Sequence, residues 1–153
     1  MDAQQEIKFT AIGFVKNGIT RNPRRPDWQL ETVSELVIDP KWTGALVGLE
    51  DFSHIIVLFY FDRIDDPEVL LKVHPMHRED LPVTGLFATR TPNRPNRIGE
   101  TVVPLLGRKE NVLRVTGLDA LDGTPILDIK PYLVSGDFIP GTKEPPWAKE
   151  THG

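Results

Sequence analysis

The sequence predicts a single-domain, mainly β fold with one or two short helices. Its length of 153 residues suits one domain. Its 14 prolines are nearly twice the usual share of about 5%. Because proline interrupts helices and central strands, many short elements joined by rigid turns are expected. The sequence has no glycine-rich strand-to-helix loop and no alternation of strands with long helices, which argues against a Rossmann-like fold.

Short apolar patterns indicate the strands in chain order. Residues 7–15 (IKFTAIGFV) alternate with period two, which is typical of a strand with one buried face. Residues 54–61 (HIIVLFYF) are β-branched and aromatic on both faces, as in a strand that is buried on both sides. Further strands are expected over residues 32–38, 84–89, 98–106, 111–117 and 125–131, with Pro104 marking an edge or a bend.

The remaining segments are expected to be short helices, loops and turns. Pro40 suits the first turn of a helix that runs to Leu46, and residues 65–72 suit one amphipathic turn or a short helix. Loops are expected over residues 16–27 and 74–82, and a turn over residues 119–123. We therefore expect one domain over residues 1–140 and a poorly ordered tail over residues 141–153.

Composition excludes several classes of protein. The sequence has no cysteine, which excludes disulfides, thiol nucleophiles, iron–sulfur clusters and cysteine-ligated zinc and favours a cytoplasmic location. The longest apolar run, residues 55–61, is far shorter than the stretch of about 20 residues that spans a bilayer, so no membrane association is expected. The N-terminus is polar and does not resemble a secretory signal. With a net charge of −4, a nucleic-acid partner requires a local basic patch.

The most informative stretch is residues 90–99, RTPNRPNRIG, where three arginines alternate with prolines and asparagines. Each proline fixes its own φ and restricts the residue before it, so the loop is expected to be stiff. Guanidinium groups held in defined directions bind carboxylates and phosphates, and asparagines can read the edge of a heterocycle. Taken alone, these residues fit either an anion-binding loop or an exposed basic turn.

Three blocks of the sequence resemble the TsaA-like (TrmO) family of S-adenosylmethionine-dependent tRNA methyltransferases. They are GALVGLEDFSHIIVL, GLFATRTPNRPNRIGETVVPLL and VTGLDALDGTPILDIKPY, and the resemblance covers about residues 9–137. Thr91 replaces the usual serine of this family, and Arg97 replaces its usual proline. Larger bacterial members carry an extra C-terminal domain, so this chain resembles the short, single-domain form.

The resemblance implies an all-β methyltransferase with a β-barrel-like core that binds S-adenosylmethionine and forms a homodimer. The implied reaction is methylation of the N6 nitrogen of threonylcarbamoyladenosine, next to the anticodon of threonine tRNA. Two alternatives stay open. One is methyl transfer to a small molecule, which the short chain and Arg97 keep under consideration. The other is a non-catalytic module that binds S-adenosylmethionine or a nucleotide.

The resemblance also implies a set of site residues. The cofactor-binding residues are expected to be Arg90, Arg94, Pro95, Asn96, Ile98, Asp122, Gly123 and Thr124. Asp128, Lys130 and Tyr132 alternate along a strand, so all three can point into one catalytic site. There they could accept a proton, neutralise a carboxylate and stack on a base. The alternative is that Asp128 and Lys130 form an ion pair and that Tyr132 packs on the barrel.

Two basic segments suggest a surface that faces RNA. The loop of residues 17–28 offers Arg21, Arg24, Arg25 and Trp28, and cations beside a stacking ring suit an unstacked anticodon loop. From residue 72 to residue 108, six Lys and Arg residues outnumber three acidic ones, and Arg97 joins the expected RNA-binding residues. Without the resemblance, local fluctuation of charge explains both segments.

The histidines give weaker signals. His54 opens the most apolar strand, where a lone histidine is more often a hydrogen-bonded core residue than a catalyst. The neighbouring Ser53 lacks the G-x-S-x-G elbow of a hydrolase. His74 and His77 lie three residues apart, but Pro75 breaks the helix that would align them, so no metal is expected.

Overall fold

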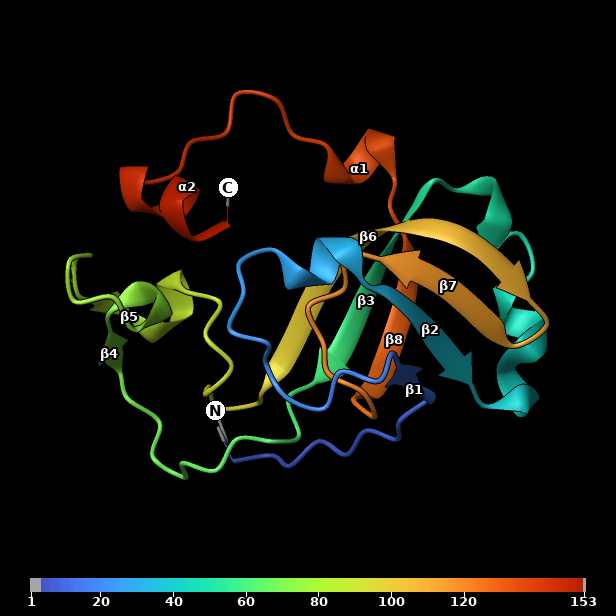
Figure 1. Cartoon of the computed structure of the whole chain (residues 1–153), viewed down its shortest axis with the longest axis horizontal. Coiled ribbons are helices and arrows are strands. Elements are labelled where there is room, and N and C mark those ends of the chain that lie inside the picture. The colour runs from blue at the N-terminus through green and yellow to red at the C-terminus, as the bar shows by residue number, and fades with distance from the viewer. Residues whose placement is uncertain (1–3, 153) are drawn as a thin grey trace. The chain divides into compact units, whose positions relative to one another are not determined.

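The computed structural model describes residues 4–152, and six of its strands close into a barrel (Figure 1). Around the barrel the strand order is β1-β2-β7-β6-β3-β8. The strands are β1 (Gly13–Lys16), β2 (Val33–Ile38), β3 (His54–Tyr60), β6 (Ile98–Lys109), β7 (Val112–Thr116) and β8 (Pro125–Pro131). The predicted mainly β fold with a barrel-like core is confirmed.

Alternation along the strands builds the core of the barrel. In β2, fully buried positions alternate with more exposed ones. Leu36 of β2 pairs with Leu113 of β7, and both side chains are fully buried, because paired residues project to the same side of a sheet. Gly13 allows β1 to approach β2 closely, since a Cβ at this position would lie 2.3 Å from the carbonyl oxygen of Val37.

Short 3-10 helices occupy the connections next to β2. They are η1 (Trp28–Glu31), η2 (Pro40–Leu46) and η3 (Leu49–Asp51). The helix expected to start at Pro40 is confirmed as η2, and Asp39 caps it by accepting a hydrogen bond from the Lys41 backbone N at 3.0 Å. Within the described part of the chain, no helix has the length and apolar character needed to cross a membrane.

The chain divides into two compact units. The barrel unit comprises the chain up to residue 60 and residues 100–132. The appended unit comprises residues 61–99 and the chain from residue 133 onward. Its elements are β4 (Lys72–Val73), η4 (Pro75–His77), β5 (Thr84–Gly85), η5 (Leu86–Ala88), α1 (Val134–Asp137) and α2 (Pro146–His152), and β4 pairs with β5. The boundary expected at residue 140 stays a prediction.

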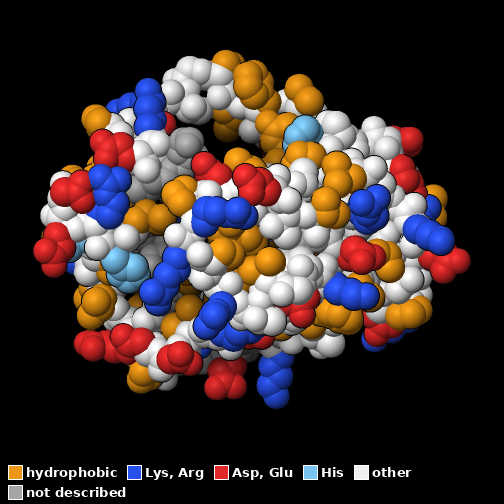
Figure 2. Space-filling model, viewed as in Figure 1, with side chains coloured by type: hydrophobic (Ala, Val, Ile, Leu, Met, Phe, Trp, Pro, Cys, Tyr) orange, Lys and Arg blue, Asp and Glu red, His pale blue; other side chains and the backbone are white. Residues whose placement is uncertain are grey.

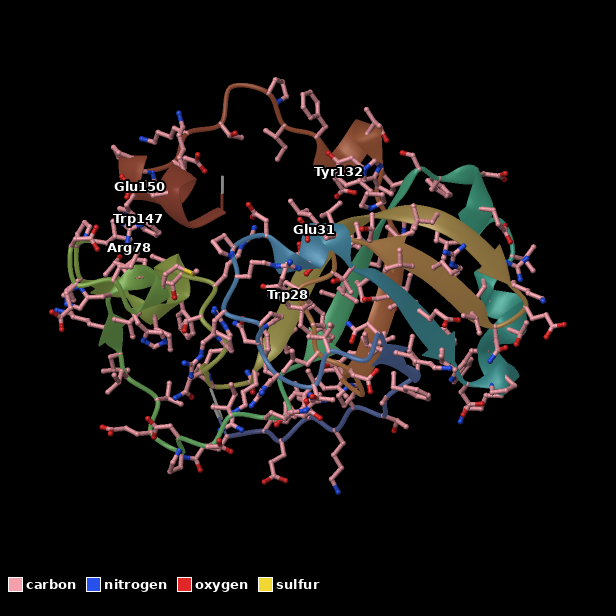
Figure 3. All side chains as sticks on the ribbon, viewed as in Figure 1. Trp28, Glu31, Arg78, Tyr132, Trp147 and Glu150 are labelled. Carbon is pink, nitrogen blue, oxygen red and sulfur yellow. The ribbon has the colours of Figure 1, made fainter. Side chains whose placement is uncertain are left out.

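Helix α2 lies within the segment expected to be a poorly ordered tail. Pro146 occupies its first turn, where proline is well tolerated. Glu150 of α2 makes an ion pair with Arg78 at 3.1 Å, and Trp147 is half-buried (Figure 3). The local sequence could not reveal this contact, because Arg78 is distant in the chain.

Several expected elements differ from the structure. Residues 65–71 form no helix, and only β5 is extended within the strand expected over 84–89. The strand expected over 7–15 begins only at Gly13, because residues 7–11 are exposed; the half-buried Ile12 already donates its backbone N to Ile126 of β8. In each case the local pattern was compatible with an element that the tertiary contacts do not support.

Two further expectations change, one about the burial of β3 and one about the position of Pro104. The prediction that β3 is buried on both faces was wrong, since one face is fully buried and the other is only partly covered. A closed barrel takes one face of each strand into its interior. Pro104 lies within β6 beside a register shift between Leu105 and Gly107, so the predicted bend is present, but this strand is not at an edge.

Candidate functional site

The polar residues of β8 lie on the outer face of the barrel. Asp128 pairs with Leu58 of β3, and Lys130 pairs with Ile56, whereas the intervening Val57 is fully buried. Because alternate residues project to opposite faces, Asp128 and Lys130 share the outer face. Just after β8, the backbone N of Tyr132 donates to the carbonyl oxygen of His54 at 3.1 Å. The strand pairing therefore places the expected catalytic residues Asp128 and Lys130 beside β3, and Tyr132 beside the first residue of β3.

Asp128 and Lys130 also form the ion pair that was considered as the alternative. Lys130 Nζ lies 2.9 Å from Asp128 Oδ2, and the two side chains are 60% and 47% exposed. The other carboxylate oxygen, Asp128 Oδ1, accepts a hydrogen bond from the backbone N of Ile129 at 2.9 Å. Both oxygens of this carboxylate are thus engaged. The pair stays accessible to a ligand because neither side chain is buried.

His54 is the main residue on this face that the sequence interpretation undervalued. It is exposed, so the expectation of a core histidine was wrong. The reason is the alternation of β3: Ile55 fills the barrel interior and His54 projects outward. Its ring meets the Tyr132 ring edge-on, with centroids 6.4 Å apart and an angle of 61°. Its Nδ1 lies 2.8 Å from Ser53 Oγ. The pairing of β3 with β8 creates this cluster, and the local sequence does not reveal it.

The turn of residues 122–124 is held tightly to the strand β1 and the loop after it. Asp122 Oδ1 accepts hydrogen bonds from the backbone N of Asn17 at 2.8 Å and of Gly18 at 2.9 Å. The backbone N of Gly123 donates to the Val15 carbonyl at 2.6 Å. Thr124 is 4% exposed. The Asp122 and Thr124 side chains thus stabilise the turn, and this gives a structural alternative to their expected contact with a cofactor.

Gly123 instead lines an open groove on the barrel unit. The groove has a volume of about 500 Å³. Its lining residues are Ala11, Ile12, Gly13, Phe14, Val37, Ile38, Asp39, Pro40, Gly123 and Pro125. Most of this surface is apolar or backbone, so the groove offers few charged groups to a ligand.

The arginine–proline loop belongs to the appended unit and is braced from within. Arg94 Nη1 donates to the carbonyl oxygens of Thr89 at 3.0 Å and of Thr91 at 3.2 Å. Its guanidinium carbon lies 5.9 Å from the centre of the Phe87 ring, which is 78% exposed. The predicted stiffness of the loop therefore comes from the arginine as well as from the prolines.

Three groups in this loop and directly before it suit S-adenosylmethionine. Phe87 presents an exposed ring on which an adenine can stack. Arg90 is exposed and, among the described residues, has no ion-pair partner, so it can bind a carboxylate. Asn93 Nδ2 donates to the Glu68 carbonyl at 2.8 Å, whereas Asn93 Oδ1 is buried with no hydrogen-bond partner among the described groups. Such an unsatisfied acceptor is suited to an amino or ammonium group.

Pro95, Asn96 and Ile98 continue the same loop into β6, and all three are exposed. Arg97 between them has a φ of 48°, a left-handed conformation that proline, the family's usual residue here, cannot adopt. Its Nη1 lies 3.5 Å from the Ile64 carbonyl, a long contact directed at the protein itself. Its expected role in binding RNA therefore competes with a role in the loop.

The expected RNA-binding loop is only partly suited to RNA. Arg21 and Arg24 are exposed, and the described chain holds no ion-pair partner for either. Arg25 pairs with Glu31 at 3.0 Å. Trp28 lies in η1 (Figure 3). Its side chain is 6% exposed and belongs to the barrel core. The expectation that Trp28 stacks on a base is corrected, because a buried ring has no free face.

The other histidines take part in no ligand cluster. His74 Nδ1 bonds to the Leu81 carbonyl oxygen at 2.8 Å within the appended unit. Among the described side chains, no three His, Asp or Glu residues come together in a way that could hold a metal ion.

Comparison with known proteins identifies related sequences. The sequence model described as the tRNA-methyltransferase O N-terminal domain matches residues 16–138. An S-adenosyl-L-methionine-binding protein of Archaeoglobus fulgidus is 40% identical over 131 residues, which cover 84% of this chain and 91% of that protein. A human tRNA (adenine(37)-N6)-methyltransferase is 36% identical over 133 residues, covering 85% of this chain and 30% of the human protein.

Solved structures support the same relationship. A crystal structure of TrmO from Pseudomonas aeruginosa matches 91% of this chain and 62% of that chain, with a TM-score of 0.71 and 32% identity. A second TrmO crystal structure matches 93% of this chain and 66% of that chain, with a TM-score of 0.73 and 35% identity. The chain spans only 39%, 51% and 58% of the length of three further curated relatives.

Proposed function

The chain belongs to the family of the tRNA-methyltransferase O N-terminal domain, and from this premise we propose that it is an S-adenosylmethionine-dependent tRNA methyltransferase. Its substrate is the N6 nitrogen of threonylcarbamoyladenosine next to the anticodon of threonine tRNA. The observation that carries the proposal is the family match across residues 16–138, which contains both the arginine–proline loop and the polar face of β8. Cytoplasmic location stays a prediction.

The cofactor role falls to the arginine–proline loop. S-adenosylmethionine supplies an activated methyl group on a sulfonium. Arg90 binds a carboxylate, Phe87 stacks on an adenine, and the buried Asn93 Oδ1 accepts a hydrogen bond. Arg94 keeps the loop in shape through its bonds to Thr89 and Thr91. A loop ordered before binding lowers the entropic cost of holding the ligand.

The acceptor role falls to the outer face of β8. Lys130 neutralises the carboxylate of the threonylcarbamoyl group, and Tyr132 offers a ring to the base. Asp128 holds Lys130 in place through the 2.9 Å ion pair. Positioning alone contributes several kcal/mol to such reactions, up to about 7–11 kcal/mol in ideal systems, so few reactive side chains are required.

The RNA contacts fall mainly to arginines that have no ion-pair partner among the described residues. Arg21 and Arg24 lie on an exposed loop of the barrel unit, and Arg25 and Arg97 join them once RNA competes for their present contacts. For about three phosphates contacted on a single-stranded loop, the logarithm of affinity should fall with the logarithm of salt concentration with a slope of about −2. A flat dependence would indicate a small-molecule acceptor.

A homodimer is also part of the proposal. The appended unit exposes large apolar side chains, including Leu71 at 84%, Val134 at 72% and Ile139 at 64%. Apolar atoms are visible at the surface of the segment between α1 and α2 (Figure 2). A second copy that covers these side chains would remove them from water. Light scattering after size exclusion should give twice the monomer mass of 17.2 kDa.

The test uses the purified protein and S-adenosylmethionine with a labelled methyl group. Two otherwise matched tRNA pools are offered, one with threonylcarbamoyladenosine and one without it. Label transferred only to the modified pool is the expected result. Transfer to both pools would keep an RNA methyltransferase but change its target base. Transfer to neither pool, with cofactor binding confirmed, would contradict the proposal and favour a small-molecule acceptor or a binding module.

A further inference from the structure

Ser53 and His54, which cluster with Tyr132 on the barrel unit, have no role in the proposal so far. We propose that His54 is a catalytic residue whose Nε2 takes the proton from the acceptor nitrogen during methyl transfer. This inference rests on the proposed function, because it assumes that the acceptor binds at the outer face of β8. Its support is the geometry around His54 and the state of the neighbouring polar groups.

The position of His54 suits a group that handles a proton at this face. Its ring packs edge-on against Tyr132 at 6.4 Å, and its carbonyl accepts a hydrogen bond from the Tyr132 backbone N. It also lies two residues before Ile56, which pairs with Lys130. The imidazole therefore shares a surface with the residues proposed to hold the acceptor.

Ser53 engages one ring nitrogen of His54 and leaves the other accessible. Nδ1 lies 2.8 Å from Ser53 Oγ, whereas Nε2 has no hydrogen-bond partner in the described part of the chain. When Nδ1–H donates to Ser53 Oγ, the lone pair of the neutral ring is on Nε2, which faces away from this bond. We infer that the Ser53 hydroxyl accepts this bond and so acts as a positioning group, because in that arrangement the ring is in the tautomer needed for a base.

The other polar groups of the face are less suited to this task. Asp128 Oδ1 already accepts a hydrogen bond from the Ile129 backbone N, and Asp128 Oδ2 is in the ion pair with Lys130. Lysine ammonium and tyrosine phenol groups are normally protonated at neutral pH, when imidazole is largely neutral. The titratable and charged groups on the elements around His54 are Asp128, Lys130 and Tyr132 from β8 and its end, Glu100, Arg108 and Lys109 from β6, and Glu50 and Asp51 from η3.

The proton balance of the reaction requires such an acceptor. The nitrogen forms one bond to the methyl carbon, and the carbon–sulfur bond breaks with its electron pair left on a neutral thioether sulfur. The N–H electron pair stays on the nitrogen, and the proton passes to Nε2 of His54, which becomes an imidazolium. Bulk water takes the proton afterwards. General base catalysis of this kind contributes about 10²–10⁴ in rate.

A first test needs no turnover. Nitrogen-15 NMR of the free protein distinguishes the two neutral tautomers of each histidine, and the spectrum of His54→Gln assigns the His54 signals. We expect neutral His54 to carry its proton on Nδ1 and to move toward the Nε2–H tautomer in Ser53→Ala. A proton on Nε2 in the unaltered protein would overturn the proposed role.

The second test measures catalysis as a function of pH. His54→Gln should lower kcat about 100-fold or more and remove the acidic limb of the rate profile, while affinity for S-adenosylmethionine stays within twofold. In His54→Ala, added imidazole should restore part of the rate, which a purely structural role would not allow. His77→Gln, a change at an exposed histidine of the appended unit, is the matched control and should behave as the unaltered protein.

The outcomes separate the two proposals. If the unaltered protein labels no tRNA, the proposed function fails, whatever the tautomer of His54. If the unaltered protein is active and folded His54→Gln keeps its kcat and its pH profile, only the role of His54 is overturned. Circular dichroism of each variant establishes that the fold is retained.

Discussion

The barrel unit and the appended unit are stabilised in different ways. Among the described apolar side chains, the buried core lies mainly in the barrel unit, whereas the appended unit contributes Pro75, Leu81 and Leu86. The appended unit depends more on polar contacts, such as the bonds of Arg94 and the ion pairs of Arg78. We infer that the barrel is a rigid support, whereas the appended unit has the less stable structure typical of ligand-binding segments.

The largest expected effect is the loss of a core side chain from the barrel. Leu113→Ala removes a fully buried side chain that pairs with Leu36, so the free energy of unfolding should fall by about 2–5 kcal/mol. Leu71→Ala in the appended unit, where the side chain is 84% exposed, is the control and should change stability by no more than about 0.5 kcal/mol. Urea denaturation measures both values. Equal losses in the two variants would contradict the contrast between the units.

A smaller effect is expected from the turn that precedes β8 and is hydrogen-bonded to β1 and the loop after it. Asp122→Ala removes the acceptor for the backbone N of Asn17 and of Gly18, and the unfolding free energy should fall by about 2 kcal/mol. Asp66→Ala, in the appended unit, removes only a local bond to the backbone N of Glu68 and should have little effect. Calorimetry with cofactor measures affinity in the same samples. A large loss of cofactor affinity in Asp122→Ala without a loss of stability would restore its expected binding role.

The reverse pattern is expected for the arginine–proline loop. Arg94→Ala removes the bonds to Thr89 and Thr91, and the disordered loop should bind S-adenosylmethionine about tenfold more weakly, equivalent to about 1.4 kcal/mol. Global stability should stay almost unchanged. Lys72→Ala, a change at an exposed lysine of β4, is the matched control. Unchanged cofactor affinity in Arg94→Ala would remove this loop from its proposed role.

The smallest expected effect is the loss of the contact between Asp80 and Arg78 at acidic pH. Hydrogen bonding to Arg78 lowers the pKa of the Asp80 carboxyl, and the same bond raises the pKa of Arg78. Because the folded pKa of Asp80 lies below its usual value of about 3.9, the contact stabilises the protein above that pH and is lost as pH falls through the lower folded value. Asp80 holds the Arg78 guanidinium that also pairs with Glu150, so α2 should loosen once Asp80 is protonated.

Hydrogen exchange of α2 at pH 7 and at acidic pH measures this release. In Arg78→Gln the protection of α2 should already be low at pH 7 and should depend little on pH. The barrel strands are the internal reference, because their protection arises from apolar burial. If α2 in the unaltered protein keeps full protection at acidic pH, the Arg78 contacts are not what holds it.

Local patterns predicted some parts of the molecule better than others. The strands β2, β7 and β8 appear in the segments that were expected to be strands, and Pro40 opens η2 as expected. The patterns failed over residues 65–71, which form no helix, and over the exposed residues 7–11, which join no strand. Strand formation depends on pairing and burial, which the local sequence does not specify.

The same distinction applies to the candidate site. Alternation alone placed Asp128 and Lys130 on one side of a strand, and the structure agrees. Trp28 was expected to be an accessible ring and His54 a core residue, and both predictions were wrong, since Trp28 is buried and His54 is exposed. Whether a ring lies in the core depends on which elements pack against it, and that information is not contained in the neighbouring residues.

The sequence by itself determined the β-rich class, the family and the stiff arginine-rich loop, because periodicity, proline content and motif order are properties of short segments. Only the tertiary structure decided the barrel order, the ion pair of Arg78 with α2 and the cluster of Ser53, His54 and Tyr132. These features join residues that are distant in the chain. They arise from strand register and burial, which depend on the packing of the whole fold.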